Sequence, residues 1–381
     1  MTGPTRLAFA AFFFFYFCYI GLMSPYASLY FAHLDFTAFE IAVLMSMFQV
    51  TRMIGPFFWG WLADMRRDRL GIMRTTAVMA TLLFPAIFFL EGFAAFLIWM
   101  FVLNIVISSL MPLGEAATVH ALQKENAFDE RYGRLRLWGS MGFIVMVMSA
   151  GAWFERYGIE GLPWFGVVAL LIMTVLTWAL REPPIEAPLQ QVIRFAHVLK
   201  NTQVQWFMAS HFWMIFAHAA LYVFYSLYLD HLGYSKAVIG IFWMLGVLAE
   251  VIFFYYQKHF FARFTSRQLL LAAYLVAALR FALIAYWPVF WVLLFAQLMH
   301  AVTFGVHHSA SIKMLQIWFH GPLQARGQAL YSTVSYGIGG TVGGIAAGYV
   351  WEHLGAAHVF GVAAISSALA YWCMQRVRLH I

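Results

Sequence analysis

The stretch Arg131-Tyr132-Gly133-Arg134-Leu135-Arg136-Leu137-Trp138-Gly139-Ser140-Met141-Gly142-Phe143 carries three arginines and runs into an apolar segment that continues to Trp153. Arg136 lies about 200° around a helix from Arg134, so the two side chains cannot share one face. A charge at membrane depth costs roughly 3 kcal/mol, and it therefore needs a partner. The stretch predicts a membrane-spanning helix in which Arg136 faces protein or a wet cavity. The alternative is that all three arginines anchor the helix start at the headgroups.

Composition places the chain among membrane proteins. Its 381 residues are 63% hydrophobic and only 10% charged, with a mean hydropathy of +0.77. A soluble domain is nearer to about one quarter charged. The net charge of +7 does not indicate nucleic-acid binding, because the basic residues sit in short gaps between apolar runs. Cys18 and Cys373 both lie in apolar runs, so neither a disulfide framework nor a metal site is expected.

Apolar runs of about 20 residues predict the membrane spans. We expect twelve, at residues 7–31, 40–62, 72–90, 94–120, 135–154, 162–180, 204–229, 237–257, 268–286, 289–313, 325–350 and 356–375. The first is long and lacks a small-residue cleavage site, so we interpret it as a retained span and not as a signal peptide. The long polar gap at 181–203 divides the spans into six and six.

Lysine and arginine set the expected orientation. If the N-terminus is inside, nineteen of the 23 basic residues fall on inside segments and helix ends. Arg156 and Lys236 fall outside, while Arg52 and Arg280 lie within spans. The positive-inside rule therefore predicts that both termini are cytoplasmic.

The two halves of the chain repeat one another. Ser28-Leu29-Tyr30 recurs 198 positions later as Ser226-Leu227-Tyr228. Gly151, Glu155 and Gly158 recur 197 positions later as Gly348, Glu352 and Gly355. Six spans return the chain to the same side, so the repeats are parallel, as in transporters whose substrate site lies near the bilayer midplane between the halves.

These observations predict an all-α membrane protein with twelve transmembrane helices in two pseudo-symmetric six-helix bundles. The expected domains are an N-terminal bundle at 1–181, a cytoplasmic linker at 182–203 and a C-terminal bundle at 204–381.

Polar residues within the spans are the candidate site, because ionisable groups at membrane depth are functional by default. Glu115 precedes Arg136 through a single turn and is its natural counter-ion. Arg52 and Glu250 occupy the same place in the two repeats, with opposite charge. Further polar or aromatic stripes at helical spacing are Asn104, Ser108, Met111 and Glu115; Trp243, Gly246 and Glu250; Gln297, His300, Thr303, His307 and Ser311; His211, His218, Tyr222 and Tyr225; and Tyr16, Tyr19, Met23, Tyr26 and Tyr30. Such stripes also arise from helix packing alone.

The buried charges do not balance. Deep in the spans, Arg52, Arg136 and Arg280 stand against two glutamates, which leaves one excess positive charge. An unpaired buried charge is costly, so the excess favours an anionic ligand. Aromatic lining from Tyr19, Phe143 and Trp243 suits an aromatic body. Together these features predict a small aromatic carboxylate, unless Arg52 only ties helices together.

The loop Gly60-Trp61-Leu62-Ala63-Asp64-Met65-Arg66-Arg67-Asp68-Arg69 resembles the signature loop of the major facilitator superfamily, with Asp68 standing at the usual glycine. The resemblance implies that Gly60, Asp64, Arg66 and Arg69 form a conformational latch between helices. A plain positive-inside loop is the alternative.

Other stretches resemble the lactose permease branch and, across the whole chain, the 3-phenylpropionate permease family. They are Pro112-Leu113-Gly114-Glu115-Ala116; Arg134-Leu135-Arg136-Leu137-Trp138-Gly139-Ser140; His218-Ala219-Ala220 with Tyr222 and Ser226; Leu248-Ala249-Glu250-Val251-Ile252; and His300 with Thr303-Phe304.

The lactose permease resemblance implies that Glu115, Arg136 and Glu250 contact substrate, with Phe143 stacking on it. It also implies that Arg280 and His300 belong to the proton machinery, while the proton-binding group of this chain would be Glu115, Glu250 or a histidine, because of one departure from the family. Where that family has an essential carboxylate, three residues after the histidine, this chain has Thr303. Asn104, Tyr19, Trp243 and His218 complete the expected substrate-binding set.

We therefore expect a secondary active transporter that imports a small organic acid, of the phenylpropionate type, by proton symport and alternating access. A proton-coupled sugar or nucleoside symporter is the alternative. A receptor or enzyme is not expected, because no nucleophile elbow, metal cluster or phosphate loop is present. The expected partners are a small-molecule substrate, protons and the lipid bilayer of a bacterial inner membrane. We expect a monomer that needs no cofactor beyond the proton gradient and binds no nucleic acid.

Overall fold

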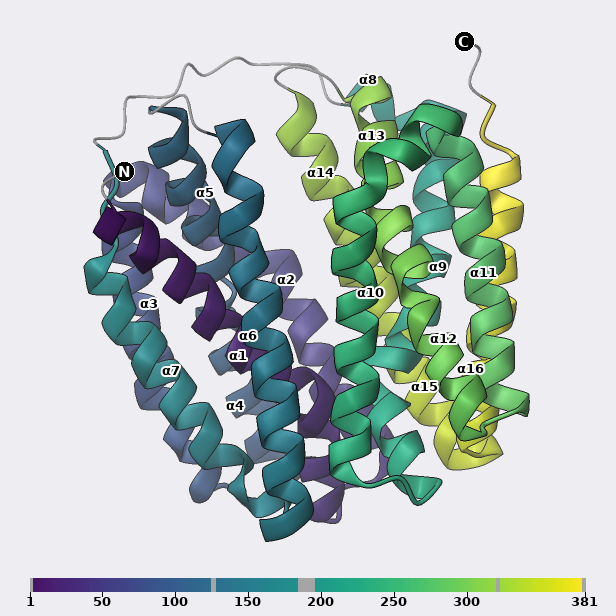
Figure 1. The fold of residues 1–381 in the computed structure, drawn as a ribbon, viewed down its shortest axis with the longest axis horizontal. Helices are drawn as coiled ribbons and strands as arrows, with labels where there is room; N and C mark the ends of the chain where they lie inside the picture. The colour runs from purple at the N-terminus through teal and green to yellow at the C-terminus, as the bar shows by residue number, and fades with distance from the viewer. Residues whose placement is uncertain (1–2, 125–127, 184–195, 320–322, 379–381) are drawn as a thin grey trace. The chain divides into compact units, whose positions relative to one another are not determined.

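The computed structural model describes residues 3–124, 128–183, 196–319 and 323–378. All regular structure in these ranges is helical, as the sequence predicts (Figure 1). Eleven helical segments of the described residues are long and apolar enough to cross a bilayer. A further helical run from Gln324 to Leu354 covers the remaining predicted span, 325–350. The protein is therefore an all-α membrane protein, and its helices follow the twelve predicted spans.

The first half of the chain contains seven α-helices and two short 3-10 turns. They are α1 (Gly3–His33), α2 (Ala38–Arg66), α3 (Arg69–Leu83), η1 (Phe84–Phe88), α4 (Gly92–Ile107), α5 (Leu110–Gln123), α6 (Phe128–Tyr157), η2 (Ile159–Gly161) and α7 (Leu162–Ala179). Here α4 and α5 together make one predicted span.

The second half is also helical throughout its described residues, but its helices are divided into more segments. Its elements are α8 (Ala196–Leu199), α9 (Thr202–His231), α10 (Lys236–Arg263), α11 (Ser266–Tyr286), α12 (Phe290–Leu298), η3 (Ala301–Val306), α13 (His307–Trp318), α14 (Gln324–Ser332), η5 (Thr333–Gly339), α15 (Gly340–Leu354) and α16 (Ala356–Gln375). Both η3 and η5 are π-helical.

Contacts between Cα atoms divide the chain into two compact units. Unit 1 comprises Met1–Phe36, Val50–Pro188 and Leu229–Met244, and unit 2 comprises Thr37–Gln49, Leu189–Tyr228 and Leu245–Ile381. Helices α2, α9 and α10 contribute residues to both units. The domains that the sequence predicts, at 1–181 and 204–381, are defined by the internal repeat and not by these contacts. They stay a prediction. Of the predicted linker, residues 184–195 lie outside the described residues.

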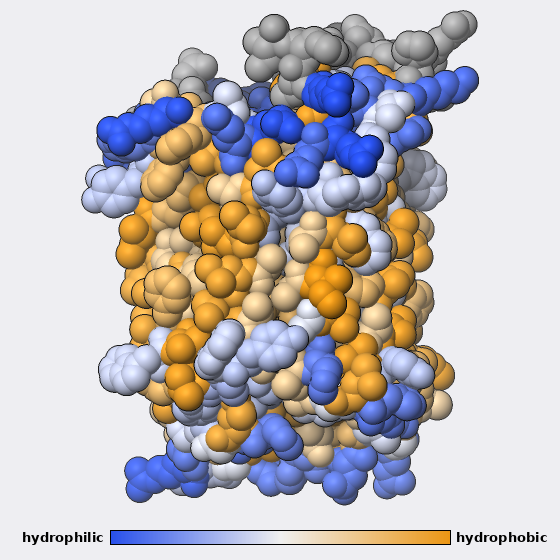
Figure 2. Space-filling view, turned by 90° about the vertical axis from the view of Figure 1, so that its right-hand side faces the viewer, coloured by the Kyte–Doolittle hydropathy of each residue, from blue (hydrophilic) through white to orange (hydrophobic). Residues whose placement is uncertain are grey.

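Hydrophobic side chains cover the surface that a bilayer would contact. On the face shown in Figure 2, hydrophobic residues form a band between two hydrophilic ends. Large apolar side chains of α7, such as Leu171, Val175 and Trp178, are more than half exposed. Lipid can cover such a surface at no hydrophobic cost, whereas water cannot.

The backbone itself repeats. Gly158 after α6 has φ 90° and ψ 159°, and Gly355 after α15 has φ 97° and ψ 162°. The two positions are 197 residues apart, the offset seen in the sequence. Positive φ is the left-handed side of backbone space, where glycine pays no Cβ penalty. The repeated glycines therefore mark one turn, used once in each half.

The predicted stripe through Asn104 and Glu115 does not lie on one continuous helix. The chain is interrupted at Ser108 and Ser109, between α4 and α5. Pro112 lies one turn further on and has no N–H, so the carbonyl of Ser108 cannot receive the usual helical bond. The Ser109 N–H bonds to the Val106 carbonyl and not to the Ile105 carbonyl. The Ile105 carbonyl accepts instead from the Ser108 hydroxyl at 2.6 Å and from Nε1 of Trp59 at 2.7 Å. Side chains thus satisfy a carbonyl where the regular helical bonds are interrupted.

Candidate functional site

The predicted pair of Arg136 and Glu115 forms in unit 1. Nε of Arg136 in α6 lies 3.1 Å from Oε1 of Glu115 in α5. The Tyr132 hydroxyl donates to the same carboxylate oxygen at 3.4 Å. The side chains of Arg136 and Glu115 are 35% and 36% exposed, so a small solute can reach both. This exposure also keeps the pair's own contribution to stability small.

Two aromatic rings of α1 lie against the guanidinium. The Arg136 Cζ is 4.9 Å from the ring centroid of Phe17 and 5.7 Å from that of Phe13. Both distances are within cation–π range. The two rings therefore contact the guanidinium from the α1 side. Sequence reasoning missed both phenylalanines, because nothing in the α1 pattern marks them among its many aromatic residues.

A second arginine belongs to the same cluster. Arg52 of α2 interacts electrostatically with the Tyr16 hydroxyl of α1, and so do Glu115 and Arg136. Tyr16 is thus within reach of two guanidinium groups and one carboxylate. Two of the three arginines that the sequence places deep in the spans thus lie within unit 1.

The other substrate-binding candidates of unit 1 are more enclosed. Asn104 is 4% exposed and donates from Nδ2 to the Met100 carbonyl at 2.7 Å. The ring of Tyr19 is fully buried against Phe84, with 6.0 Å between centroids. Its hydroxyl has no hydrogen-bond partner among the described residues.

Phe143 of α6 and Trp243 of α10 pack against each other. Their ring centroids lie 6.5 Å apart, and each residue is 7% exposed. Both residues belong to unit 1. The structure therefore brings together two of the three aromatic residues that the sequence analysis names as an aromatic lining.

In unit 2, Arg280 is fully buried and bonded to three side chains. Its Nη1 donates to the Thr303 hydroxyl at 2.9 Å and to Nδ1 of His300 at 3.1 Å. Its Nη2 donates to Oε1 of Gln297 at 3.2 Å. The sequence left Arg280 alone among apolar residues in its span, and only the packing of α11 against α12 and η3 supplies its partners.

These bonds determine which nitrogen of His300 carries the proton. A guanidinium has donors only, so the Nδ1 atom facing Arg280 must accept. Neutral His300 then carries its proton on Nε2, which lies 3.8 Å from Oε2 of Glu250 in α10. A second proton on His300 would face the Arg280 donors and break that contact. The pair Glu250–His300 is therefore sensitive to one proton.

Backbone irregularity accompanies this cluster. The π-helical η3 begins at Ala301, directly after His300, and contains Thr303. Such π-bulges frequently occur at functional sites. Gly246 of α10 lies beside Gln297 and His300, and a Cβ there would be 3.1 Å from Oε1 of Gln297. The glycine thus lets α10 approach the polar residues of α12 and η3.

His218 of α9 lies next to the Arg280 cluster in unit 2. It is 1% exposed, and its Nδ1 donates to the Met214 carbonyl at 2.9 Å. It interacts electrostatically with both Arg280 and His300. The predicted substrate-binding role of His218 stays a prediction, whereas its place beside the proton-coupling candidates is a finding.

The loop between α2 and α3 has the geometry of two adjoining helix caps. The Asp68 N–H bonds to the Ala63 carbonyl and the Arg67 N–H to the Asp64 carbonyl, which is a Schellman C-cap. The left-handed residue is Arg67, with φ 51°, and not Asp68. The Asp68 carboxylate instead accepts from the Gly71 N–H at 2.7 Å and caps α3. Gly60, Asp64 and Arg66 lie on the last turns of α2, and Asp64 and Arg66 are exposed.

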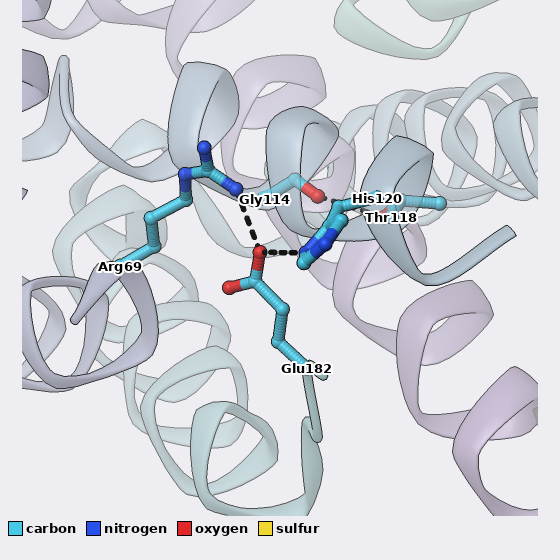
Figure 3. A network of polar contacts seen from close by, with 5 residues as sticks. All are labelled: Arg69, Gly114, Thr118, His120 and Glu182. Atoms are coloured by element: carbon cyan, nitrogen blue, oxygen red, sulfur yellow. Dashed lines mark hydrogen bonds and ion pairs between the residues drawn. The ribbon is translucent and has the colours of Figure 1, made fainter. Parts of the chain in front are cut away.

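Arg69 has a partner that sequence reasoning missed. Its Nη1 lies 2.7 Å from Oε1 of Glu182, just beyond α7, and Nδ1 of His120 lies 2.9 Å from the same oxygen (Figure 3). The Glu182 side chain is only 5% exposed. One carboxylate oxygen therefore joins the start of α3, the end of α5 and the segment after α7. The run Arg181-Glu182-Pro183 was the available signal, since an acidic residue there stands among inside arginines.

Curated transporters resemble this chain along nearly its whole length. A "Probable 3-phenylpropionic acid transporter" of Escherichia coli (strain K12) is 28% identical over 370 residues, which cover 96% of each chain. The maltose permease of Geobacillus stearothermophilus is 25% identical over 364 residues, which cover 93% of this chain and 90% of the permease.

A solved structure with the same fold is that of the nucleoside transporter NupG. It matches with a TM-score of 0.83 and 17% identity, covering 99% of this chain and 100% of that chain. At such low identity the likeness concerns the fold alone. The MFS_1 like family matches residues 6–362. With its two repeated six-helix halves and membrane-embedded charges, the chain belongs to the MFS_1 like family and is a membrane transporter of the major facilitator superfamily, not an enzyme.

Proposed function

We propose that this transporter imports a small organic acid, an aromatic carboxylate of the 3-phenylpropionate type, by proton symport and alternating access. The observation that carries the proposal is the unit 1 cluster, in which the guanidinium groups of Arg52 and Arg136 lie with Glu115 around the Tyr16 hydroxyl. A partly buried site lined by two guanidinium groups attracts an anion more than a neutral solute. We place the protein in a bacterial inner membrane as a monomer, with both termini cytoplasmic.

The carboxylate would bind to the fork of Arg136. Arginine holds a carboxylate through two parallel N–H···O bonds, and it stays charged at any relevant pH. Glu115 already faces one donor of Arg136, Nε, at 3.1 Å. An arriving substrate carboxylate competes with Glu115, and Arg52 then compensates the added negative charge. The rings of Phe13 and Phe17 beside the guanidinium suit an aromatic substrate body.

Proton coupling would use the unit 2 cluster. Glu250 is the carboxylate that lies next to His300, and Arg280 orients the imidazole from its other side. Thr303 contributes a hydroxyl to Arg280 in place of the carboxylate that the lactose permease branch has there. Glu250 is thus the proposed proton-binding group. His300 lies between Glu250 and Arg280, so it would transmit the change in charge of Glu250 to Arg280.

A proton-coupled sugar or nucleoside symporter is the second candidate. Glu115 and Glu250 can accept hydrogen bonds from hydroxyl groups, and the maltose permease is 25% identical to this chain. The relative named as a probable 3-phenylpropionic acid transporter is 28% identical, a difference too small to decide by itself. The charge of the unit 1 cluster favours the acid.

Transport by proteoliposomes tests the proposal. Vesicles that hold purified protein would receive labelled 3-phenylpropionate, maltose or uridine, with and without an imposed proton gradient. We expect accumulation of 3-phenylpropionate only with the gradient, and counterflow of the same compound without it. Arg136→Gln should abolish both, whereas Arg156→Gln, the same change at the other end of α6, should not. Transport of maltose or uridine in place of the acid would overturn the assignment.

A further inference from the structure

A basic and aromatic cluster of unit 2 lies at the end of α16, apart from the charged groups of the proposed transport site. It consists of Trp206 of α9, Trp372 of α16 and Arg376, the residue that follows α16. The two indole rings lie 5.3 Å apart, at 88° to each other. The Cζ atom of Arg376 is 4.7 Å from the ring centroid of Trp372 and 5.9 Å from that of Trp206. Both distances are within cation–π range, so both rings contact the guanidinium.

The backbone on either side of Arg376 is tied to a neighbouring helix. Nε of Arg267 in α11 donates to the Val377 carbonyl at 2.7 Å, and Nη2 of the same arginine donates to the Gln375 carbonyl at 3.1 Å. The Val377 side chain is fully buried. The segment that follows α16 is therefore a fixed part of unit 2, and the Arg376 side chain extends from a held backbone.

The donors of this cluster have no hydrogen-bond acceptor in the part of the chain that the structure describes. A guanidinium has five N–H groups, and each indole has one. No bond of the Arg376, Trp206 or Trp372 side chains to an acceptor is formed there, whereas the indoles of Trp59 and Trp99 donate to backbone carbonyls. Trp372 is 45% exposed, and Arg376 is exposed as well. A ligand of this cluster must therefore supply acceptor oxygens.

No acidic side chain of unit 2 lies near enough to neutralise Arg376. The acidic residues of this unit are Glu40, Glu250 and Glu352. Glu352 precedes the turn into α16, so the length of α16, about 30 Å, separates it from Arg376. The start of α2, which carries Glu40, packs beside Gly348 at that same far end. Glu250 lies in the middle of α10. The ligand must therefore also supply negative charge.

The exposed face of α16 continues the cluster toward the bilayer interior. Ile365, Leu369 and Trp372 precede Arg376 at alternating spacings of four and three residues, so they form one stripe along the helix. Ile365 is 65% exposed and Leu369 38%. The 20 residues of α16 span roughly 30 Å, the thickness of the hydrocarbon core. The stripe thus presents apolar side chains at the depth of acyl chains and a guanidinium at the depth of headgroups.

We propose that this cluster binds an anionic glycerophospholipid, such as phosphatidylglycerol, from the leaflet on the side where α16 ends. The phosphate oxygens accept from the Arg376 guanidinium and from the indole N–H groups, and one acyl chain lies along Ile365 and Leu369. A zwitterionic lipid fits less well, because its ammonium group needs an anion and unit 2 has no acidic side chain at this end. This side is cytoplasmic in the orientation that the basic residues predict. The assignment does not depend on which solute is transported.

Lipid binding by purified, delipidated protein tests the site. Native mass spectrometry gives the affinity for phosphatidylglycerol of the wild type, Arg376→Gln and Arg263→Gln. Arg263 is the matched control, because it is an exposed arginine at the end of α10 with no aromatic contact among the described residues. An arginine beside an anionic headgroup contributes about fivefold in affinity, so Arg376→Gln should weaken the tightest site at least about fivefold. Arg263→Gln should bind like the wild type. Equal affinity in Arg376→Gln and Arg263→Gln would overturn the proposal.

The apparent Tm in detergent separates this lipid from its alternatives, and it needs only wild-type protein. Phosphatidylglycerol should raise the apparent Tm more than phosphatidylethanolamine or inorganic phosphate does. Trp372→Leu, which removes one ring and one N–H group but no charge, should reduce the gain. An equal gain from phosphatidylethanolamine would show that the headgroup charge is not recognised. An equal gain from inorganic phosphate would assign the cluster to a free anion. Either result would refute the lipid site.

Discussion

Gly142 of α6 and Gly339 of η5 occupy equivalent places in the two repeats, and each lies against the backbone of an equivalent phenylalanine. A Cβ at Gly142 would lie 2.0 Å from the carbonyl oxygen of Phe14, and one at Gly339 would lie 2.8 Å from that of Phe212. The glycines are 197 residues apart and the phenylalanines 198. The repeat found in the sequence is thus a repeat of helix packing, in which a glycine lets the backbone of the first helix of each half come close.

This packing predicts unequal effects of added methyl groups. Gly142→Ala must displace the α1 backbone and should cost about 1–3 kcal/mol, seen as a lower apparent Tm in detergent. Gly339→Ala has more room and should cost less. Gly133→Ala, also in α6, meets nothing within 4 Å and should be neutral or stabilising. A Gly142→Ala protein as stable as Gly133→Ala would contradict the close approach.

The left-handed backbone at Arg67 predicts a stabilising substitution. A non-glycine residue in this conformation destabilises the fold by roughly 1–2 kcal/mol. Glycine avoids this strain, but it gives the unfolded chain more conformational entropy, which offsets part of the gain. Arg67→Gly should therefore raise the apparent Tm slightly. Arg66→Gly, one residue earlier and still in α2, should lower it. The opposite ranking would show that the Arg67 side chain matters more than its strain.

The shared carboxylate of Glu182 predicts a coupled loss. Glu182→Gln removes the charge that faces both Arg69 and His120, and we expect a loss of about 1–3 kcal/mol. Arg69→Gln should cost a similar amount, and the double variant little more, because both changes break one contact. Glu160→Gln is the matched control. Its partner is His33, and those side chains are 59% and 43% exposed, so its effect should be under about 1 kcal/mol. Strictly additive effects of the Glu182 and Arg69 changes would reject the coupling.

Glu250→Gln should abolish uphill uptake and leave substrate exchange. Glutamine resembles the protonated carboxylic acid, so the loaded carrier can still turn over, but no proton can be released. Energised vesicles would show no accumulation of 3-phenylpropionate, whereas counterflow would continue. Glu352→Gln, an exposed position at the end of α15, should behave like the wild type. Normal accumulation by Glu250→Gln would remove Glu250 from the proton step.

The ranking of two variants in unit 1 separates an acid from a sugar. Arg136→Lys keeps the charge but loses the fork, so affinity for 3-phenylpropionate should fall by roughly tenfold or more. Glu115→Gln removes the competitor for Arg136 and should weaken binding less, or tighten it. Calorimetry of purified protein, at a pH where the ligand is ionised, gives both affinities. Equal and near-total loss in the two variants would favour the sugar or nucleoside reading, because Glu115 would then bind hydroxyl groups.

The sequence by itself determined the membrane class, the helical spans and the repeat. Hydropathy suffices for the spans, because the bilayer requires about 20 apolar residues and full backbone bonding in each. It also indicated the pairing of Arg136 with Glu115, since a buried charge needs a partner and one turn joins their spans. The breaks at Ser108 and in η3 were not foreseen. A hydropathy run stays continuous across a local change of helix type.

Only the tertiary structure decided which side chains from separate spans share a cluster. Arg280 has no polar neighbour along α11, and its partners His300, Thr303 and Gln297 come from the elements packed beside it. Glu182 likewise meets Arg69 across 113 positions. Helical spacing shows which residues share a face of one helix, but not how far that helix is rotated toward its neighbours. Rotation and neighbour are set by the packing of whole helices, and the partners of buried charges follow from it.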